Sequence, residues 1–318
     1  MTDRDAIGID VGGTKIHAFR VASDGTIRER ATRPTPADDT EAILAEMAAL
    51  ADEIRDERVV AVGIGAAGLV DANAGVMRFS PNLAWREVPV RDRVRDALGI
   101  PVLLENDASA AAYGEWRFGA GRGVRHLLLV TVGTGIGGGV IADGRLSRGA
   151  HGFAGDIGHI IVEPGGPMCG CGNLGCWEQV AAGQTIDRLG REAAAEHEHS
   201  MIARLVGGDP ALVTGEIVTE AAERGDVVAI RILQRVGRRL GEGIAGFVNA
   251  IDPEVVVIGG GAIVAGDFLL GPARGAFRQA LEGTDHRPEV PLVPAELGND
   301  AGAIGAAALA LDELVAGD

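Results

Sequence analysis

Two patterns of hydrophobic and polar positions alternate along this 318-residue chain. Short apolar runs that end in Gly, Asn or Asp are typical of buried strands. Stretches with an apolar residue every three or four positions are typical of amphipathic helices. The helical pattern is clearest over residues 38–56, where the apolar positions are Ile43, Leu44, Met47, Leu50 and Ile54. Because the two patterns alternate from end to end, the sequence predicts an α/β fold.

The predicted elements can be given by their residue ranges. The expected strands are 6–11, 16–22, 26–32, 59–65, 102–104, 126–132, 140–142, 145–146 and 255–258. The expected helices are 38–56, 88–98, one that opens at 108–113, several within 183–250, and a closing Ala-rich helix at 300–313.

One arrangement occurs twice, about 120 residues apart: a strand, a Gly-rich turn, a strand, an Asp-Gly hairpin and a strand. In the first copy the turn is Gly12-Gly13-Thr14-Lys15 and the hairpin is Asp24-Gly25. In the second copy the turn spans 133–139 and the hairpin is Asp143-Gly144. Such a duplication predicts two copies of one unit that face each other and place two phosphate-holding turns across one cleft.

Composition narrows the possible partners. Gly accounts for 49 residues, many of them in pairs and triplets after apolar runs, which indicates turns that approach a ligand closely. The formal net charge of −16 argues against a nucleic-acid partner. Apolar stretches are too short to span a membrane, and the charged N-terminus does not resemble a signal peptide. We therefore expect a soluble, cytoplasmic protein.

Three Gly-rich turns are candidates for nucleotide binding. In the first, Gly12 and Gly13 let backbone N–H groups surround a phosphate, Thr14 and Lys15 add donors, and Asp10 can reach Mg²⁺ or a metal-bound water. A plain β-hairpin is the alternative reading. The second turn supplies Thr134 and Gly135. The third, with Gly260 and Gly261, can lie against a flat base, although tight helix–strand packing explains it nearly as well.

Glu105-Asn106-Asp107 follows a predicted strand, at the end where open α/β sheets bind ligands. Asp107 can accept the proton of a sugar hydroxyl that attacks phosphorus. Its alternative role is to cap the helix that follows.

All three cysteines lie within eight positions, as Cys169, Cys171 and Cys176, and His159 stands ten residues before the first. Three thiolates and an imidazole make a closed tetrahedral zinc site with no open position, so the metal should be structural. Reduced, inert cysteines are the alternative. Asp156 and Glu178 flank this group, which would hold the two carboxylates at the edge of the metal site.

Together these motifs resemble those of the ROK family of sugar kinases, and most closely its bacterial glucokinases, over almost the whole chain. The similar segments are Asp10–Lys15, Gly63–Gly68, Ser80–Asn82, Glu105–Glu115, Thr131–Gly139 and the His159 and cysteine group. In two places the chain departs from the family. Asp156 stands where the family usually has Glu, one methylene longer, and Ser109 stands where it more often has Asn.

The resemblance implies a two-domain actin-like ATPase fold and a kinase that transfers the γ-phosphate of ATP to the 6-hydroxyl of glucose. It implies Asp107 as general base and six groups that bind the sugar: Asn106, Asp156, His159, Glu178, Asn82 and Gly68. We expect a small domain over 1–108, closed by a helix within 301–318, and a large domain over 109–300. The resemblance also implies a dimer or tetramer.

Several alternatives stay open. Another hexose, such as mannose, fructose or an N-acetylhexosamine, is an alternative sugar. Polyphosphate is an alternative phosphoryl donor, although the chain has no evident basic track. A sugar-responsive repressor or a silent sugar-binding protein is a further alternative. Family repressors add an N-terminal helix-turn-helix domain, and the first predicted strand begins near residue 6.

Overall fold

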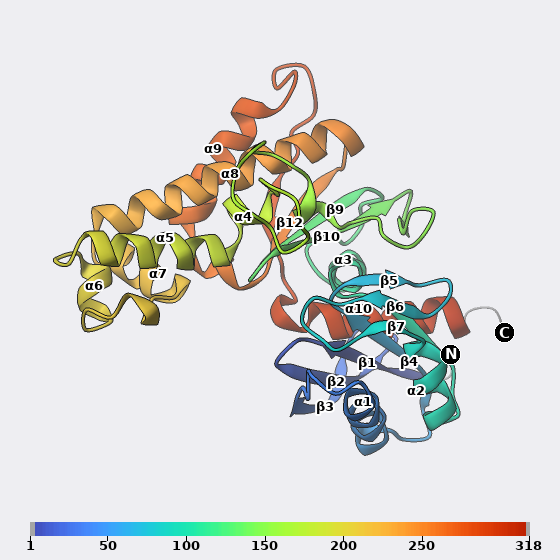
Figure 1. Cartoon of the computed structure of the whole chain (residues 1–318). Helices are drawn as coiled ribbons and strands as arrows, with labels where there is room; N and C mark the ends of the chain where they lie inside the picture. Colours follow the sequence, from blue (N-terminus) through green and yellow to red (C-terminus); the bar gives the residue numbers. More distant parts are fainter. Residues whose placement is uncertain (1–3, 316–318) are drawn as a thin grey trace. The chain divides into compact units, whose positions relative to one another are not determined.

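The computed structural model describes residues 4–315, and the ends of the predicted domain ranges at 1–3 and 316–318 lie outside them. The chain divides into two compact units (Figure 1). Unit 1 comprises Met1–Leu129, Gly138–Asp156 and Ala295–Asp318, and unit 2 comprises Val130–Gly137 and Ile157–Pro294.

The first five-stranded sheet belongs to unit 1. Its strands are β1 (Asp5–Val11), β2 (Lys15–Ala22), β3 (Ile27–Pro34), β4 (Val59–Ala66) and β8 (Val102–Asn106). Their order is β3-β2-β1-β4-β8. The pairs β1–β2 and β2–β3 are antiparallel, whereas β1–β4 and β4–β8 are parallel. The carboxyl ends of β1, β4 and β8 therefore meet at one edge, which carries Asp10, Ala66 and Asn106.

Helices accompany this sheet within unit 1. They are α1 (Thr40–Ile54), α2 (Val90–Leu98), α3 (Asp107–Phe118) and α10 (Ala301–Ala310), which continues into a π-helical turn (Leu311–Val315). The five apolar positions predicted for the first helix are all buried in α1, and they pack in one core with β1, β4 and β8. The 3.6-residue pattern was therefore a correct guide to the buried face.

Several glycines of unit 1 lie where α10 touches the sheet. A Cβ atom on Gly8 of β1 would collide with the carbonyl oxygen of Ala303, and one on Gly63 of β4 with that of Ala306. α10 therefore packs directly on the strand backbones, which only glycine permits. Part of the high glycine content thus serves packing and not ligand binding.

The second five-stranded sheet has the order β11-β10-β9-β12-β13. Its strands are β9 (Leu127–Val132), β10 (Ile136–Ala142), β11 (Arg145–Leu146), β12 (Val255–Gly259) and β13 (Leu292–Pro294). If the strands of each sheet are numbered along the chain, both sheets have the spatial order third, second, first, fourth, fifth. The predicted duplication is therefore present.

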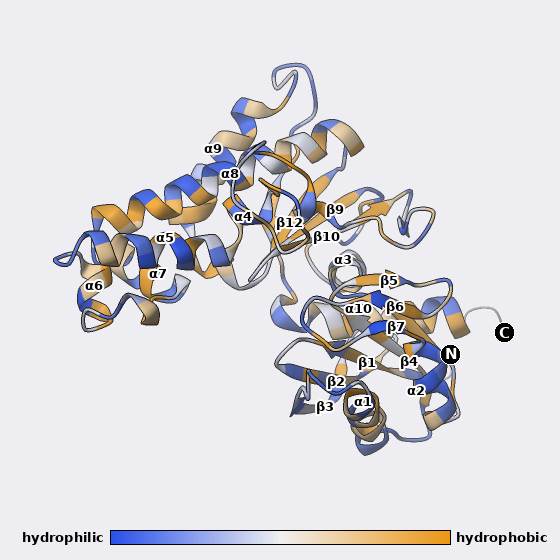
Figure 2. Ribbon diagram, in the orientation of Figure 1, coloured by the Kyte–Doolittle hydropathy of each residue, from blue (hydrophilic) through white to orange (hydrophobic). Residues whose placement is uncertain are grey.

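Most of the chain between β11 and β13 is helical. The helices are α4 (Glu178–Ala181), α5 (Gly183–Glu196), α6 (Met201–Leu205), α7 (Gly215–Glu223), α8 (Val227–Ile251) and α9 (Asp267–Ala280). Figure 2 shows hydrophobic and hydrophilic colours alternating along α5 and α7, and the buried residues of α5, α7 and α8 form one core. Within residues 4–315, none of the helices combines the length and apolar character needed to cross a bilayer.

Two expectations about the elements need correction. The second Gly turn is shorter than the predicted 133–139, because β10 already begins at Ile136. Gly139 lies in this strand, where a Cβ atom would collide with the side chain of Ala112 on α3. A small sheet of β5 (Leu69–Asp71), β6 (Val76–Phe79) and β7 (Arg86–Val88) was not predicted. Strands of three or four residues are too short for a period-two pattern to mark them.

The units also divide the chain differently from the predicted domains 1–108 and 109–300, which stay a prediction. α3 belongs to unit 1 because it packs closely on α10: a Cβ on Gly114 would lie 2.7 Å from the carbonyl oxygen of Ala301.

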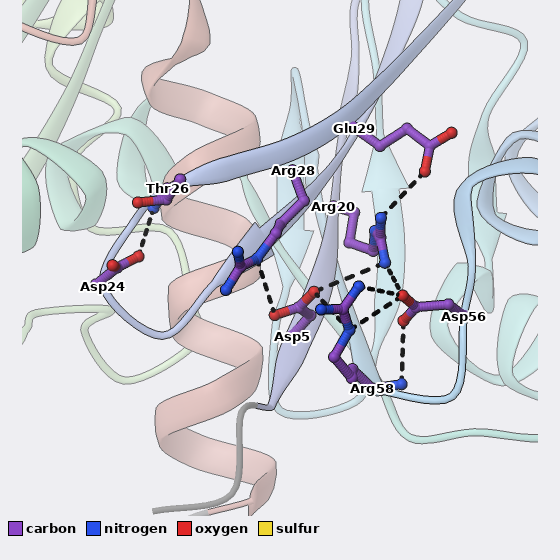
Figure 3. Close-up of polar contacts among 8 residues, drawn as sticks. All are labelled: Asp5, Arg20, Asp24, Thr26, Arg28, Glu29, Asp56 and Arg58. Atoms are coloured by element: carbon purple, nitrogen blue, oxygen red, sulfur yellow. Dashed lines mark hydrogen bonds and ion pairs between the residues drawn. The ribbon is translucent and has the colours of Figure 1, made fainter.

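A cluster of charges surrounds Asp5 at the start of β1 (Figure 3). The side chain is fully buried, and neither carboxylate oxygen has a hydrogen-bond partner among the described residues. Arg20, Arg28 and Arg58 place guanidinium nitrogens 3.9, 3.8 and 4.0 Å from it. Arg20 and Arg58 also bind Asp56. Opposite charges thus compensate one another here, at the end of β1 away from Asp10.

Candidate functional site

Asn106 and Asp107 lie at the junction of β8 and α3. Asn106 is the N-cap of α3: its side-chain oxygen accepts the N–H of Ser109 at 3.0 Å, and its amide donates to the carbonyl of Gly68 at 3.2 Å. The structure thus gives the capping role to Asn106, whereas Asp107 is the first residue of the helix. The N-cap position is therefore not what places an acid at 107.

Three carboxyl groups influence one another in unit 1. Burial, and secondarily the charge of Asp107, raise the pKa of Asp10 to about 7. Burial also raises the pKa of Asp107, and the charge of Asp156 adds to this effect. Hydrogen bonds from Ala108, from its own backbone N–H and from Asn106 oppose the rise. A carboxylate whose pKa is raised accepts a proton more readily, which suits a general base.

The first Gly turn joins β1 to β2. The N–H of Gly12 donates to the carbonyl of Lys15 at 3.0 Å, and the hydroxyl of Thr35 donates to the carbonyl of Gly12 at 2.8 Å. The N–H of Thr35 also donates to the carbonyl of Thr14 at 2.9 Å. A Cβ atom on Gly13 would lie 3.2 Å from the Cβ of Asn82. The structure therefore places Asn82, a predicted sugar-binding residue, beside this turn.

The second Gly turn joins β9 to β10 and lies against the start of α5 in unit 2. The N–H of Gly133 donates to the carbonyl of Gly135 at 3.0 Å. Gly183, the first residue of α5, donates to the carbonyl of Gly133 at 2.8 Å, and Gln184 donates to that of Thr134 at 3.4 Å. The positive end of the α5 dipole thus points at the turn, which favours an anion.

The third Gly segment follows β12. Gly260 has φ +89°, and a Cβ atom there would lie 2.5 Å from the carbonyl oxygen of Val132, the last residue of β9. Thr134, Gly135, Gly260 and Gly261 are therefore gathered at the ends of two strands of the second sheet. The contribution of α5 to this turn was not predicted, although the small residues 181–183 that allow its close approach are visible in the sequence.

His159, Cys169, Cys171 and Cys176 come together in unit 2, with ligand atoms all within 4.8 Å of one another. The Sγ of Cys169 lies 3.5 Å from Nδ1 of His159, and the sulfurs of Cys171 and Cys176 are 3.5 Å apart. Four soft or borderline donors in such a small space can hold one metal ion. This is the ligand set that the spacing in the sequence predicts.

Glu178, the first residue of α4, lies between this group and the second Gly turn. Its Oε1 is 3.1 Å from Sγ of Cys169 and 3.7 Å from Nδ1 of His159. Its other oxygen would be 2.6 Å from a Cβ atom on Gly135. Glycine at 135 therefore makes room for the carboxylate.

The segment that carries these residues is fastened to α8. The indole of Trp177 is fully buried and donates to the carbonyl of Arg239 at 2.9 Å. It packs against Gly243 of α8, where a Cβ atom would collide with the ring. The guanidinium of Arg239 in turn binds the carboxylate of Glu163 at 2.8 Å. The position of Glu178 is thus fixed from two sides, by Trp177 and by the cysteine group.

The predicted site residues fall into two sets. Those of unit 1 are Asp10, Gly12, Gly13, Thr14, Lys15, Gly68, Asn82, Asn106, Asp107 and Asp156. Those of unit 2 are Thr134, Gly135, His159, Cys169, Cys171, Cys176, Glu178, Gly260 and Gly261. Unit 1 carries the candidate base and unit 2 carries the candidate metal ligands.

Two sheets of equal topology, each with a Gly turn after its first strand, define the two-domain actin-like sugar kinase fold. The chain belongs to the ROK family, whose sequence model matches residues 6–313. Both the predicted family and the predicted fold class are confirmed.

Individual relatives agree with this assignment. The chain is 41% identical over 307 residues to the glucokinase of Streptomyces coelicolor, which covers 96% of each protein. A solved structure of a ROK family glucokinase from Streptomyces griseus, in complex with glucose and AMPPNP, is 40% identical with a TM-score of 0.88. It covers 97% of this chain and 99% of the other. The N-acetylmannosamine kinase of Citrobacter koseri is 36% identical over 305 residues, 96% of this chain and 98% of that protein.

Proposed function

We propose that this protein is an ATP-dependent glucokinase that transfers the γ-phosphate of ATP to the 6-hydroxyl of glucose. The observation that carries the proposal is its similarity, over nearly the whole chain, to a glucokinase whose structure contains glucose and AMPPNP. The site residues of both units suit this chemistry. Unit 1 offers the candidate base, the first Gly turn and most of the sugar-binding candidates, and unit 2 offers Glu178, His159 and the other two Gly segments.

Asp107 is the proposed general base. Its carboxylate takes the proton of the 6-hydroxyl as that oxygen attacks the γ-phosphorus. Asn106, Asp156, Glu178, His159, Asn82 and Gly68 are the proposed sugar-binding groups. Asn106 already uses part of its side chain to cap α3, so it would hold a hydroxyl from a fixed position.

The phosphates are proposed to lie against the Gly turns. Gly12, Gly13, Thr14 and Lys15 contribute from the first turn, Thr134 and Gly135 from the second, and Gly260 and Gly261 approach the base. Lys15 adds a positive charge, and the N–H groups add donors that need no side chain. Phosphoryl transfer depends mainly on such positioning and electrostatic stabilisation.

Two metal ions are part of the proposal. Mg²⁺ bound with ATP would neutralise phosphate charge, and the half-buried carboxyl of Asp10 fits a cation because the described ion pairs give it no cationic partner. Zn²⁺ would be held by His159, Cys169, Cys171 and Cys176, and four protein ligands leave it no place for substrate. Its role would be to shape the loop that carries Glu178.

The test is a coupled ADP-release assay in zinc-replete protein. MgATP is offered with glucose, mannose, fructose, N-acetylglucosamine or N-acetylmannosamine, and polyphosphate replaces ATP in a parallel series. We expect glucose to have the highest kcat/KM. A preference for another hexose would change the assigned substrate but keep the same mechanism. Silence across the whole panel would contradict the kinase function and favour a binding or regulatory role.

Asp107→Asn is the variant that tests the base. It should lower kcat by about 10²–10⁴ while glucose binding, followed by calorimetry, is largely retained. Asp267→Asn is the matched control, because Asp267 also opens a helix but its side chain is 94% exposed. Near-normal turnover of Asp107→Asn would exclude Asp107 as the base. Cytoplasmic location and a dimeric or tetrameric state remain predictions.

A further inference from the structure

Arg148 lies between two carboxylates of unit 1. Its Nε is 2.5 Å from Oε2 of Glu105, and one of its terminal nitrogens is 2.8 Å from Oε1 of Glu313. Glu105 is the penultimate residue of β8, and Glu313 belongs to the π-helical turn after α10. One guanidinium therefore joins three segments that are far apart in the sequence.

Glu105 connects this group to the candidate base. The residue is fully buried, and its Oε1 accepts the N–H of Asn106 at 3.0 Å. Asp107 follows directly. The carboxylate of Glu105 is thus held on one side by Arg148 and on the other by the backbone that carries Asn106 and Asp107.

Arg148 also begins the loop that ends at Asp156. The N–H of Ala154 donates to the carbonyl of Arg148 at 3.1 Å, which closes the loop on itself. Gly152, at φ +88°, would place a Cβ 2.7 Å from the carbonyl oxygen of Val70. Gly155, at φ +102°, would place one 2.6 Å from that of Gly138. The loop is therefore compact, and its first residue, Arg148, is tied by one hydrogen bond to Ala154, two residues before Asp156.

The third partner is itself fixed. Asp312, beside Glu313, accepts the hydroxyl of Tyr113 at 2.6 Å and forms an ion pair with Arg117. Tyr113 and Arg117 both belong to α3, the helix that Asp107 begins. The C-terminal turn is thus bound to α3 through Asp312 and to Arg148 through Glu313.

We propose that Arg148 is a positioning residue. It holds the 148–156 loop, and with it Asp156, in a fixed position relative to Asn106 and Asp107. The proposal rests on the proposed function, because its kinetic consequence is expressed in sugar binding. Asp156 and Asp107 already influence each other electrostatically, so a displacement of the loop changes the surroundings of the base as well as a sugar contact.

The charge of Arg148 has a second consequence. Burial raises the pKa of Glu105, and Arg148 is the main influence that opposes this rise. A buried carboxylate that loses its cation is strongly destabilised, so removing Arg148 alone disturbs both the loop and β8. Removing both charges together should be less disruptive than removing the cation alone.

The test compares Arg148→Gln, Arg148→Lys, Glu313→Gln and the double variant Glu105→Gln/Arg148→Gln. Arg33→Gln is the matched control, since Arg33 also bridges two carboxylates, Glu46 at 2.9 Å and Glu53 at 2.7 Å, but none of the three is buried. KM for glucose and for ATP, kcat, and hydrogen exchange of peptides covering 148–156 and α8 are measured.

We expect Arg148→Gln to lower kcat/KM for glucose on the order of 10²-fold, while KM for ATP changes less than about threefold. Arg148→Lys keeps the charge but not the two-sided geometry, so it should recover only part of the loss. Glu313→Gln should raise KM for glucose by a smaller factor. Exchange within 148–156 should become about tenfold faster in Arg148→Gln and unchanged in α8.

Equal changes of KM for glucose and ATP would overturn the proposal, and so would unchanged exchange in 148–156. If Arg148→Gln does not fold, Glu313→Gln and Arg148→Lys decide by the same two readouts. If the unmodified protein phosphorylates none of the hexoses, the proposed function fails, and hydrogen exchange alone decides whether Arg148 holds the loop.

Discussion

The two Gly turns of the duplicated unit have the same length but differ in charge. Gly12-Gly13-Thr14 separates β1 from β2, and Gly133-Thr134-Gly135 separates β9 from β10. The penultimate residue of the strand before the turn is Asp10 in the first copy and Thr131 in the second. The first residue after the turn is Lys15 in the first copy and Ile136 in the second.

This difference separates what both turns share, the backbone N–H groups, from what only the first turn has, the charged side chains beside it. Both copies keep backbone N–H groups in a glycine-lined turn, which is sufficient to hold a phosphate oxygen. Only the first copy adds a carboxylate and an ammonium group, which can act on a metal ion and on phosphate charge. In the second copy the acid beside the turn, Glu178, comes from the segment that carries the cysteine group.

Loss of the cysteine group should have the largest effect on kinetics. Glu178, the acid beside the second Gly turn, depends on this group for its position. Cys171→Ala should lose bound zinc and raise KM for glucose on the order of 10²-fold, with KM for ATP little changed. Metal content is measured with a chromophoric chelator and KM with the ADP assay. Met168→Ala, a change at a 66% exposed side chain of the same loop, is the control and should keep its zinc. A variant without zinc that keeps its glucose affinity would disprove the dependence.

Alanine substitution of the turns should have an intermediate effect and should separate their roles. In Gly135→Ala the new Cβ would lie 2.6 Å from Oε2 of Glu178, so we expect about a tenfold rise in KM for glucose. In Gly12→Ala the nearest atom is the carbonyl oxygen of Lys15 at 3.3 Å, so the effect should be smaller and fall on KM for ATP. The same kinetic change in both variants would mean that the two turns do not differ in role.

The smallest expected effect is the pH dependence that Asp10 confers on the first copy. With its pKa raised to about 7, the folded protein keeps a proton that the unfolded chain releases near pH 3.8. Between these values the folded state binds more protons, so stability falls as pH rises. Asp10 is partly exposed, which limits the effect to about 1 kcal/mol.

Urea unfolding of the metal-free protein and of Asp10→Asn tests this expectation at pH 5, 6, 7 and 8. The Asn variant should gain stability relative to the unmodified protein as the pH rises. A difference between the two that is constant from pH 5 to pH 8 would show that Asp10 does not titrate in this window.

Local patterns in the sequence were sufficient for the features that local spacing determines. The duplicated order, the buried stripe of α1 and the set of His159 with three cysteines follow from residues close together in the chain. Contacts across the fold were not accessible in this way. The collision that makes Gly8 necessary involves Ala303, and the partners of Arg148 are Glu105 and Glu313. Asn106 and Asp107 could not be told apart as caps, because both side chains can accept a backbone N–H at a helix start.

Lys15 is the single lysine of the chain and its side chain is exposed. An amine-directed reagent therefore has one side-chain target, and that target directly follows the first Gly turn. Acylation by such a probe can be followed on a single peptide, with nucleotide occupancy read as protection from labelling. The same arrangement advises against immobilising the protein through lysine, since the one lysine available for coupling adjoins the turn proposed to hold the phosphates.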